Sequence, residues 1–208
     1  MAYAQGDYTT AEQRWEETFR LSRSEEDTLT EAMASVGTGL IEMVRPDYEV
    51  ATASVEKALP LFDRCGQVSS LEGYGYDPQG EAALARVFLG TTLLARGDLE
   101  GAERRFEEGL ESARRRGDPL GTYVGLYNLA QLALVRGDLA LATRTLEEVG
   151  ARVYNFYQPD PSLRERAVAE AQAVLSEPAF EEARERGRGM TFEQAVKYAL
   201  EREEPSPT

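Results

Sequence analysis

The chain has no histidine and a single cysteine among its 208 residues. Without histidine there can be no Ser-His or Cys-His nucleophile pair and no histidine-ligated metal centre. The lone Cys65 cannot form a disulfide within the chain, which fits a reducing cytoplasm. We therefore expect a cytoplasmic, non-enzymatic protein with no catalytic residues, no metal site and no cofactor.

Long apolar runs and glycine-rich phosphate loops are also missing. No segment approaches the roughly 20 apolar residues of a membrane-spanning helix, and no glycine-rich loop carries the lysine of an ATPase. The first residues lack the basic and apolar parts of a signal peptide. The formal net charge of −14 opposes phosphate backbones. We expect no membrane contact and no direct contact with nucleic acid.

One short pattern recurs four times: Gly or Pro, then Asp, then Tyr or Leu, with Ala four residues after the Asp. The copies are Gly6-Asp7-Tyr8…Ala11, Pro46-Asp47-Tyr48…Ala51, Gly97-Asp98-Leu99…Ala102 and Gly137-Asp138-Leu139…Ala142. Their Asp residues are 40, 51 and 40 residues apart. A period near 40 is typical of stacked helical repeats. The sequence predicts an all-α fold, a right-handed α-solenoid of antiparallel helix pairs.

Each copy reads as a turn between two helices. Gly97 suits a helix end that needs positive φ, and Asp98 suits the N-cap of the next helix. A small residue also lies seven positions before each of the last three copies, where two helix backbones should cross closely. These residues are Gly39, Gly90 and Ala130. An unrelated helical bundle is the alternative, but four copies in register argue against it.

The pattern resembles the tetratricopeptide repeat, with a small residue in the first helix, Gly-Asp at the turn, and Ala followed by an aromatic residue. The resemblance covers about residues 1–157, in repeats longer than is usual for the family. Such long repeats are similar to those of large bacterial regulators of the signal-transduction ATPase type, including LuxR-type activators. The chain itself lacks the ATPase and helix-turn-helix domains of those regulators.

A second resemblance lies near the end of the chain. Residues 179–200, from Ala179-Phe180 through Thr191-Phe-Glu-Gln194 to Leu200, are similar to the segment that closes the repeat region in those regulators, although Arg184 stands where an aromatic residue is common. We expect a helix, a turn at Gly187–Gly189, and a last helix opened by a Thr191…Gln194 capping box. Residues 158–202 would then be capping helices and 203–208 a tail or linker.

The start of the chain fits the last turn of a repeat helix whose beginning is absent. The first repeat would then be truncated, and the next helix would carry an apolar face without a partner. That face is expected to contain Tyr8, Trp15 and Phe19. A second copy of the chain, forming a homodimer, or upstream repeats could cover it.

The spacing of 51 indicates an insertion at about residues 66–80. Insertions in a solenoid often lie on the binding side, so Tyr74 and Tyr76 are candidate contacts; a tolerated surface loop is the alternative. The family's geometry implies a second candidate surface, the groove formed by the first helix of each repeat. Its expected residues are Leu84, Val87, Thr91, Tyr123, Tyr127, Asn128 and Gln131. The two amides could instead bond a neighbouring helix or water.

Two charged patterns were interpreted as ordinary helix surface. Adjacent glutamates such as Glu107-Glu108 do not face one another on a helix, so they predict a solvated face rather than an acid–base pair. Arg114-Arg115-Arg116 falls in the last turn of a predicted helix, where cations complement the helix dipole. Neither pattern indicates chemistry.

These observations favour a non-catalytic interaction and regulatory module. By resemblance it would be the helical-repeat sensor region of a LuxR-type regulator or related ATPase, binding a protein, a peptide or a small inducer. The alternative is a free-standing tetratricopeptide scaffold that binds an extended peptide or associates with itself. The reading frame around the chain distinguishes the two.

Overall fold

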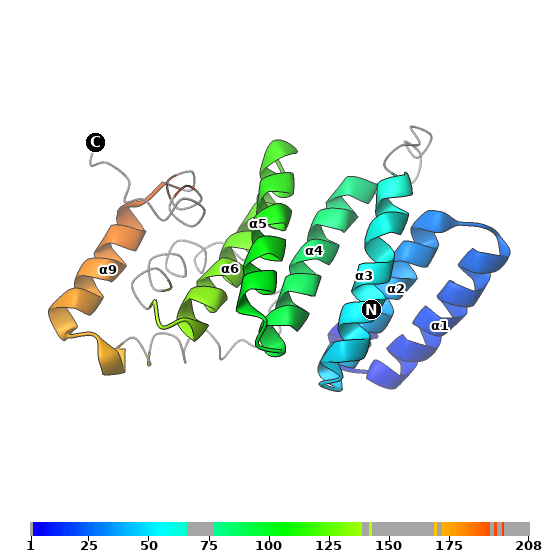
Figure 1. Cartoon of the computed structure of the whole chain (residues 1–208), viewed down its shortest axis with the longest axis horizontal. Helices are drawn as coiled ribbons and strands as arrows, with labels where there is room; N and C mark the ends of the chain where they lie inside the picture. The colour runs from blue at the N-terminus through cyan, green and yellow to red at the C-terminus, as the bar shows by residue number, and fades with distance from the viewer. Residues whose placement is uncertain are drawn as a thin grey trace. The chain divides into compact units, whose positions relative to one another are not determined.

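The computed structural model describes residues 2–65, 77–138, 142, 169, 172–191, 194 and 197. Figure 1 shows the described elements, all of them helical. They are η1 (Tyr3–Gln5), α1 (Tyr8–Ser24), α2 (Thr28–Val44), α3 (Tyr48–Cys65), α4 (Pro78–Ala95), α5 (Leu99–Arg115), α6 (Pro119–Val135) and α9 (Glu177–Gly189). The predicted all-α fold is confirmed. Within the described residues no helix combines the length and hydropathy needed to span a membrane.

The chain divides into two compact units, Met1–Gly121 and Thr122–Thr208. In the first unit each helix packs against the next one along the chain: α1 on α2, α2 on α3, α3 on α4, and α4 on α5. Figure 1 shows these helices as neighbouring rods that run alternately up and down. The first unit is therefore a stack of antiparallel helices packed in sequential order.

Aspartate side chains open six of the described helices, at spacings of 20 or 21 residues except for the 30 residues between Asp47 and Asp77. Each aspartate carboxylate accepts a hydrogen bond from a backbone N–H in the first turn of its helix. The N–H groups of a first turn have no acceptor within the helix. The capping residues are Asp7, Asp27, Asp47, Asp77, Asp98 and Asp118. The predicted 40-residue step thus contains two similar halves. Asp27, Asp77 and Asp118 are not copies of the sequence pattern, because none of their turns carries the full Gly/Pro-Asp-Tyr/Leu…Ala spacing.

The helix ends close in one recurring geometry. Gly97 has φ +83°, and the N–H groups of Gly97 and Asp98 donate to the carbonyl oxygens of Leu94 and Leu93. This two-bond closure satisfies carbonyls at the helix end and favours glycine in the left-handed position. Gly6 and Asp7 donate to Tyr3 and Ala2 in the same way. Residues 2–6 therefore form a short helical turn that ends like the longer helices.

Small residues lie where helices approach closely. A Cβ built on Gly90 of α4 would lie 2.5 Å from the ring of Phe106 on α5, and one built on Gly39 of α2 would lie 2.8 Å from Val55 on α3. Phe106 and Val55 are both fully buried. The prediction that small residues in the first helix of a pair receive large residues from the second is confirmed for these two pairs.

The core of the first unit joins α2, α3 and α4. The buried side chains of this cluster are Ala32, Val55, Ala58, Leu61, Phe62, Ala82, Ala85 and Leu89. Beside it, the hydroxyls of Thr52 on α3 and Thr92 on α4 form a buried hydrogen bond of 3.0 Å. This core fixes the three consecutive helices on which the candidate site is built.

In the second unit, the structure of α9 and of the residues that follow it differs from one prediction and confirms another. The expected turn at Gly187–Gly189 is part of the helix, which continues to Gly189 before the chain becomes extended at Met190. Neither glycine has the positive φ that would end the helix there. The capping box is present, because Gln194 N–H donates to Thr191 Oγ1 (3.3 Å) and Thr191 N–H donates to Gln194 Oε1 (2.8 Å). About half of residues 158–202, and all of 203–208, lie outside the described residues.

Candidate functional site

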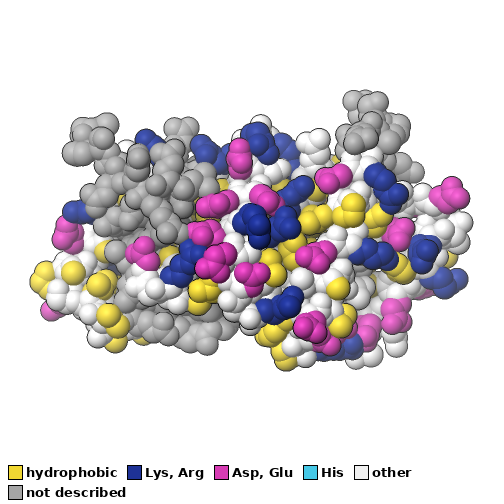
Figure 2. Space-filling view, viewed as in Figure 1, with side chains coloured by type: hydrophobic (Ala, Val, Ile, Leu, Met, Phe, Trp, Pro, Cys, Tyr) yellow, Lys and Arg dark blue, Asp and Glu magenta, His cyan; other side chains and the backbone are white. Residues whose placement is uncertain are grey.

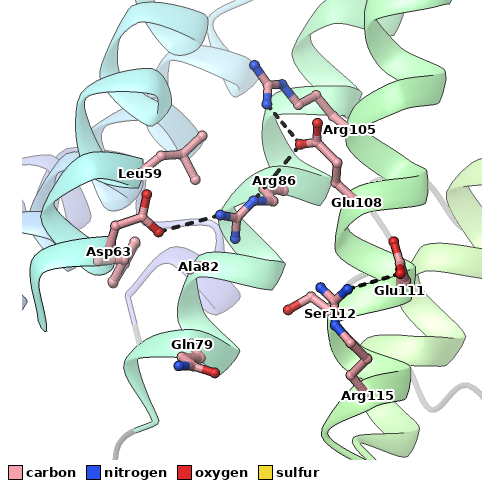
Figure 3. A pocket seen from close by; sticks show the side chains of 11 residues that line it. Leu59, Asp63, Gln79, Ala82, Arg86, Arg105, Glu108, Glu111, Ser112 and Arg115 are labelled. Atoms are coloured by element: carbon pink, nitrogen blue, oxygen red, sulfur yellow. Dashed lines mark hydrogen bonds and ion pairs between the residues drawn. The ribbon is translucent and has the colours of Figure 1, made fainter. Parts of the chain in front are cut away.

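The candidate site is a cavity of about 640 Å³ in the first unit, between α3 and α5 and over α4. Figure 3 shows α4 between the two outer helices, with side chains from all three facing the same space. The lining residues are Leu59, Phe62 and Asp63 on α3; Gln79, Ala82 and Arg86 on α4; and Arg105, Glu108, Glu111, Ser112 and Arg115 on α5.

Helical periodicity explains why these residues face the cavity together. Counted from the first lining residue of each helix, the others lie three or four residues further on, or at sums of these numbers, which places them along one face. The α3 face is mainly apolar, whereas the α5 face is mainly charged. The cavity therefore combines an apolar side with a charged side, an arrangement common in ligand sites.

Arg86 reaches from α4 toward both outer helices. Its Nη2 lies 3.6 Å from Asp63 Oδ1 on α3, and its Nε lies 4.0 Å from Glu108 Oε2 on α5 (Figure 3). The Arg86 side chain is 24% exposed, so it is partly removed from water. These two long ion pairs connect the opposite sides of the cavity through a single guanidinium.

The α5 side of the cavity carries two closer pairs. Arg105 Nη1 donates to Glu108 Oε2 at 2.8 Å, and Arg115 Nη1 donates to Glu111 Oε1 at 2.9 Å. With Arg86 and Asp63, the lining holds equal numbers of arginines and carboxylates. The cavity is therefore formally neutral, in contrast to the acidic chain as a whole. On the face drawn in Figure 2, charged side chains of both signs are likewise interspersed.

One end of the cavity lies near a second charged cluster. Arg116, which follows α5, pairs with Asp77 (3.5 Å) and Asp118 (3.1 Å), the residues that cap α4 and α6. Burial raises the pKa of Glu81 in the first part of α4, the nearby Asp77 raises it further, and Arg116 opposes both effects. Arg116 thus acts at a helix end, as predicted, and it joins the starts of two other helices.

The predicted first-helix groove does not coincide with this cavity. Val87 is buried against α5, where a Cβ on Gly109 would lie 2.7 Å from its Cγ2. Thr91 donates its hydroxyl to the Val87 carbonyl of its own helix (3.0 Å). Leu84 is half-buried and lies two residues before Arg86. A separation of two residues is a rotation of about 200° around the helix axis, so Leu84 lies on a different face from Arg86. The structure therefore does not bring these three residues to the cavity.

The other predicted contacts lie elsewhere. Tyr123, Tyr127, Asn128 and Gln131 lie on α6 in the second unit, and all but the half-buried Tyr123 are buried. Asn128 donates to the Val124 carbonyl one turn earlier in its own helix (2.8 Å), a bond within α6 rather than one to a neighbouring helix or to water. Tyr74 and Tyr76, in the expected insertion, lie outside the described residues; the last three residues of the expected range, 78–80, begin α4.

The expected unpartnered face of α1 is largely used within the chain. Trp15 lies directly on Gly37 of α2, and the Phe19 ring has Lys57 Nζ of α3 at 4.1 Å from its centre. Tyr8 remains 39% exposed, with its ring 5.6 Å from that of Tyr3. Trp15 and Phe19 are half-buried and contact α2 and α3, and self-association through this face stays a prediction.

The cavity contains the groups of a binding site. Its arginines donate hydrogen bonds, its carboxylates accept them, and its apolar side buries hydrophobic groups. Across the described ranges, no group of three His, Cys, Asp or Glu residues could hold a metal ion. The sequence reasoning missed this site because Glu108 and Arg115 were assigned to solvated helix faces. The opposite charges of Asp63, Arg86 and Glu108 on three consecutive helices could have indicated it.

Comparison with protein families identifies tetratricopeptide repeats. The family model described as Tetratricopeptide repeat matches residues 83–108 and 124–148. The first match begins inside α4 and ends in α5, the hairpin that carries most of the cavity lining. Comparisons with curated proteins and with solved structures each found no match. The matches support the repeat family over these residues and carry nothing on the LuxR-type resemblance.

Proposed function

We propose that this chain is a protein-interaction module that receives its partner at the cavity between α3, α4 and α5. Tetratricopeptide repeats generally bind proteins or peptides, and the matched repeat 83–108 contributes to this cavity. The observation that carries the proposal is the lining itself, in which paired charges from three consecutive helices lie beside an apolar surface. Such a lining offers both hydrogen bonds and hydrophobic burial to an incoming side chain.

The proposed regulatory role is more specific. We propose that the chain is the sensor region of a LuxR-type regulator or related signal-transduction ATPase, on the basis of the long repeats and the similarity of residues 179–200. Because α3 and α5 are joined across the cavity through Arg86, a bound partner would change how these helices are held. That change could pass along the stack to neighbouring domains.

The genomic sequence tests the regulatory role directly. An ATPase encoded before Met1 and a helix-turn-helix domain encoded after Thr208 are the expected results. Stop codons on both sides would overturn the regulatory role, while leaving the interaction module in place. Self-association through α1 also remains a prediction, and light scattering of the purified chain measures it.

Two neighbouring arginines provide a matched test of the interaction site. Arg105 lines the cavity, whereas Arg104 is exposed and is not part of the lining. The wild-type chain, Arg105→Ala and Arg104→Ala would each be used for affinity capture from the source cells, followed by titration of the captured protein in purified form. We expect Arg105→Ala to weaken binding by about 5-fold or more, as a contact residue does, and Arg104→Ala to leave it unchanged.

Two outcomes contradict the proposal. A partner that binds all three proteins equally lies on another surface of the stack. A substrate turned over by the chain, with turnover abolished by one substitution in the cavity, would make it an enzyme.

A further inference from the structure

We propose that the cavity binds a ligand with an oxyanion group, a carboxylate or a phosphate, held by Arg86, and an apolar body placed against α3. This inference rests on the proposed function for the location of the site, and adds the chemistry of what binds there. Two observations support it: the Arg86 guanidinium lacks short hydrogen bonds to the described residues, and the cavity has one apolar side and one charged side.

Arg86 is poorly satisfied by the protein. A guanidinium has five N–H donors in a fixed plane. The two ion pairs of Arg86, at 3.6 and 4.0 Å, are longer than hydrogen bonds, and no residue in the described part of the chain accepts a hydrogen bond from it. Its side chain is nonetheless only 24% exposed and faces the cavity. A planar oxyanion is the acceptor that fits such a donor fork, through two parallel hydrogen bonds.

The nearby carboxylates leave room for that oxyanion. Glu108 and Glu111 are hydrogen-bonded to Arg105 and Arg115 (2.8 and 2.9 Å), which offsets their charge. Asp63 is 64% exposed and can turn into solvent when a ligand replaces it beside Arg86. Arg105 also lines the cavity, and its charge is already offset by its hydrogen bond to Glu108. The charge balance around Arg86 therefore changes in favour of an anion once Asp63 moves.

The apolar body follows from the opposite side. Phe62 and Ala82 are buried at the base of the cavity, and Leu59 is half-buried beside them. The volume of about 640 Å³ lies within the usual range for small-ligand sites. A group the size of a phenyl ring can contact this surface while an attached oxyanion reaches Arg86.

Small aromatic probes test the inference on the full chain. Phenylacetate and phenyl phosphate supply an oxyanion on an apolar body, phenylacetamide is the neutral counterpart of phenylacetate, and inorganic phosphate lacks the apolar body. NMR of the ¹⁵N-labelled protein, including the arginine Nε–Hε signals, reports where each probe binds. We expect saturable shifts at Arg86 with phenylacetate or phenyl phosphate. Phenylacetamide and inorganic phosphate should bind with an affinity at least about 10-fold lower.

A blocked Phe-Glu dipeptide distinguishes the source of the oxyanion. Tighter binding of the dipeptide than of phenylacetate indicates the side chain of a partner peptide, and the reverse order indicates a free small molecule. Either order supports an oxyanion site.

Substitutions separate the donor fork from positive charge alone. Arg86→Lys keeps the charge and removes the fork, and should weaken binding of the better probe by about 10- to 100-fold. Ser112→Phe, which fills the cavity from α5 and leaves every charge in place, should also prevent binding. The control Arg104→Ala should bind like the wild type, and thermal unfolding of each variant verifies that it is folded.

The inference is overturned if no probe causes saturable shifts, if phenylacetamide binds as tightly as phenylacetate, or if both cavity variants bind like the wild type. These results are independent of the capture experiment above. If the probes bind but Arg105→Ala leaves the binding of the protein partner unchanged, only the proposed interaction site is refuted. If Arg105→Ala weakens the binding of the partner but no probe binds, only the oxyanion site is refuted.

Discussion

The ring of Phe106 lies directly on the Cα of Gly90, so closely that a Cβ on Gly90 would be 2.5 Å from the ring. Phe106 is fully buried, and the carbonyl of Ala102 lies 3.1 Å from the same point. The α4–α5 hairpin therefore has no space for even one methyl group at this crossing. Because α4 and α5 line the candidate cavity, this contact also sets its shape.

Gly90→Ala should destabilise the protein. The added methyl group must displace the buried Phe106 ring or separate the helices, which costs about 1–3 kcal/mol and exceeds the gain in helix propensity of about 1 kcal/mol. Chemical denaturation followed by circular dichroism measures the change. Gly189→Ala is the control, since a Cβ there meets nothing within 4 Å. Equal effects of the two substitutions would show that the Phe106 contact is not tight.

The sequence predicted a close helix crossing at Gly90 but not the cavity, and the reason is physical. Spacing of small and large residues along one helix reports how closely its neighbour approaches, so Gly90 and Phe106 could be identified from the chain alone. The cavity depends on three helices, of which α3 and α4 are separated by the longest connection among α1 to α6. Charged residues such as Arg86 and Glu108 look like solvated positions until their helices are placed together.

The face of α1 shows the same limit. Helical periodicity predicts that α1 has an apolar face, but periodicity does not say what covers that face. Gly37 lies on the same helix as Gly39, and it too is a small residue at a close helix approach, where it contacts Trp15. This second glycine was therefore a sequence signal for the Trp15 contact.

Glu26→Gly should stabilise the protein. Glu26 has φ +57° immediately before the capping Asp27, whereas Gly6, Gly97 and Gly117 take positive φ immediately before their own aspartates. This conformation destabilises a residue with a Cβ by about 1–2 kcal/mol in the folded state. Glycine removes that strain, and the greater conformational entropy of glycine in the unfolded chain offsets only part of the gain. We expect a gain of about 0.5–1 kcal/mol, measured by thermal and chemical unfolding.

The neighbouring Glu25 supplies the control for that substitution. Glu25 has φ −104°, a value that any residue adopts, so Glu25→Gly should lower stability through the unfolded state alone. The opposite ordering of the two variants would contradict the left-handed conformation at Glu26.

Asp98→Ala should weaken the hairpin that carries the cavity. The Asp98 carboxylate accepts a hydrogen bond from Gly101 N–H at 2.9 Å and caps α5. Loss of such a cap costs about 0.5–2 kcal/mol. Asp98→Asn, which retains the accepting oxygen, should lose far less. If the two variants are equally unstable in urea denaturation, the loss comes from charge rather than from the cap.

Glu81→Gln should stabilise the protein at neutral pH and not at low pH. Burial and the nearby Asp77 raise the pKa of Glu81, although Arg116 opposes them. A raised pKa means that the folded state favours the protonated carboxyl group. The contribution of Glu81 to stability is therefore greatest below the ordinary pKa of glutamate and falls as the pH rises through its pKa in the folded protein. Glutamine remains neutral throughout, so it avoids this loss.

Thermal unfolding of wild type and Glu81→Gln over a range of pH measures this effect. The difference in Tm should favour the variant near pH 7 and shrink as the pH falls below the ordinary pKa of glutamate. Glu100→Gln removes an exposed carboxylate from the first turn of α5 and should lower Tm slightly at neutral pH, because that charge complements the helix dipole. A wild type more stable than Glu81→Gln at neutral pH would mean that the attraction of Arg116 outweighs the burial of the carboxylate.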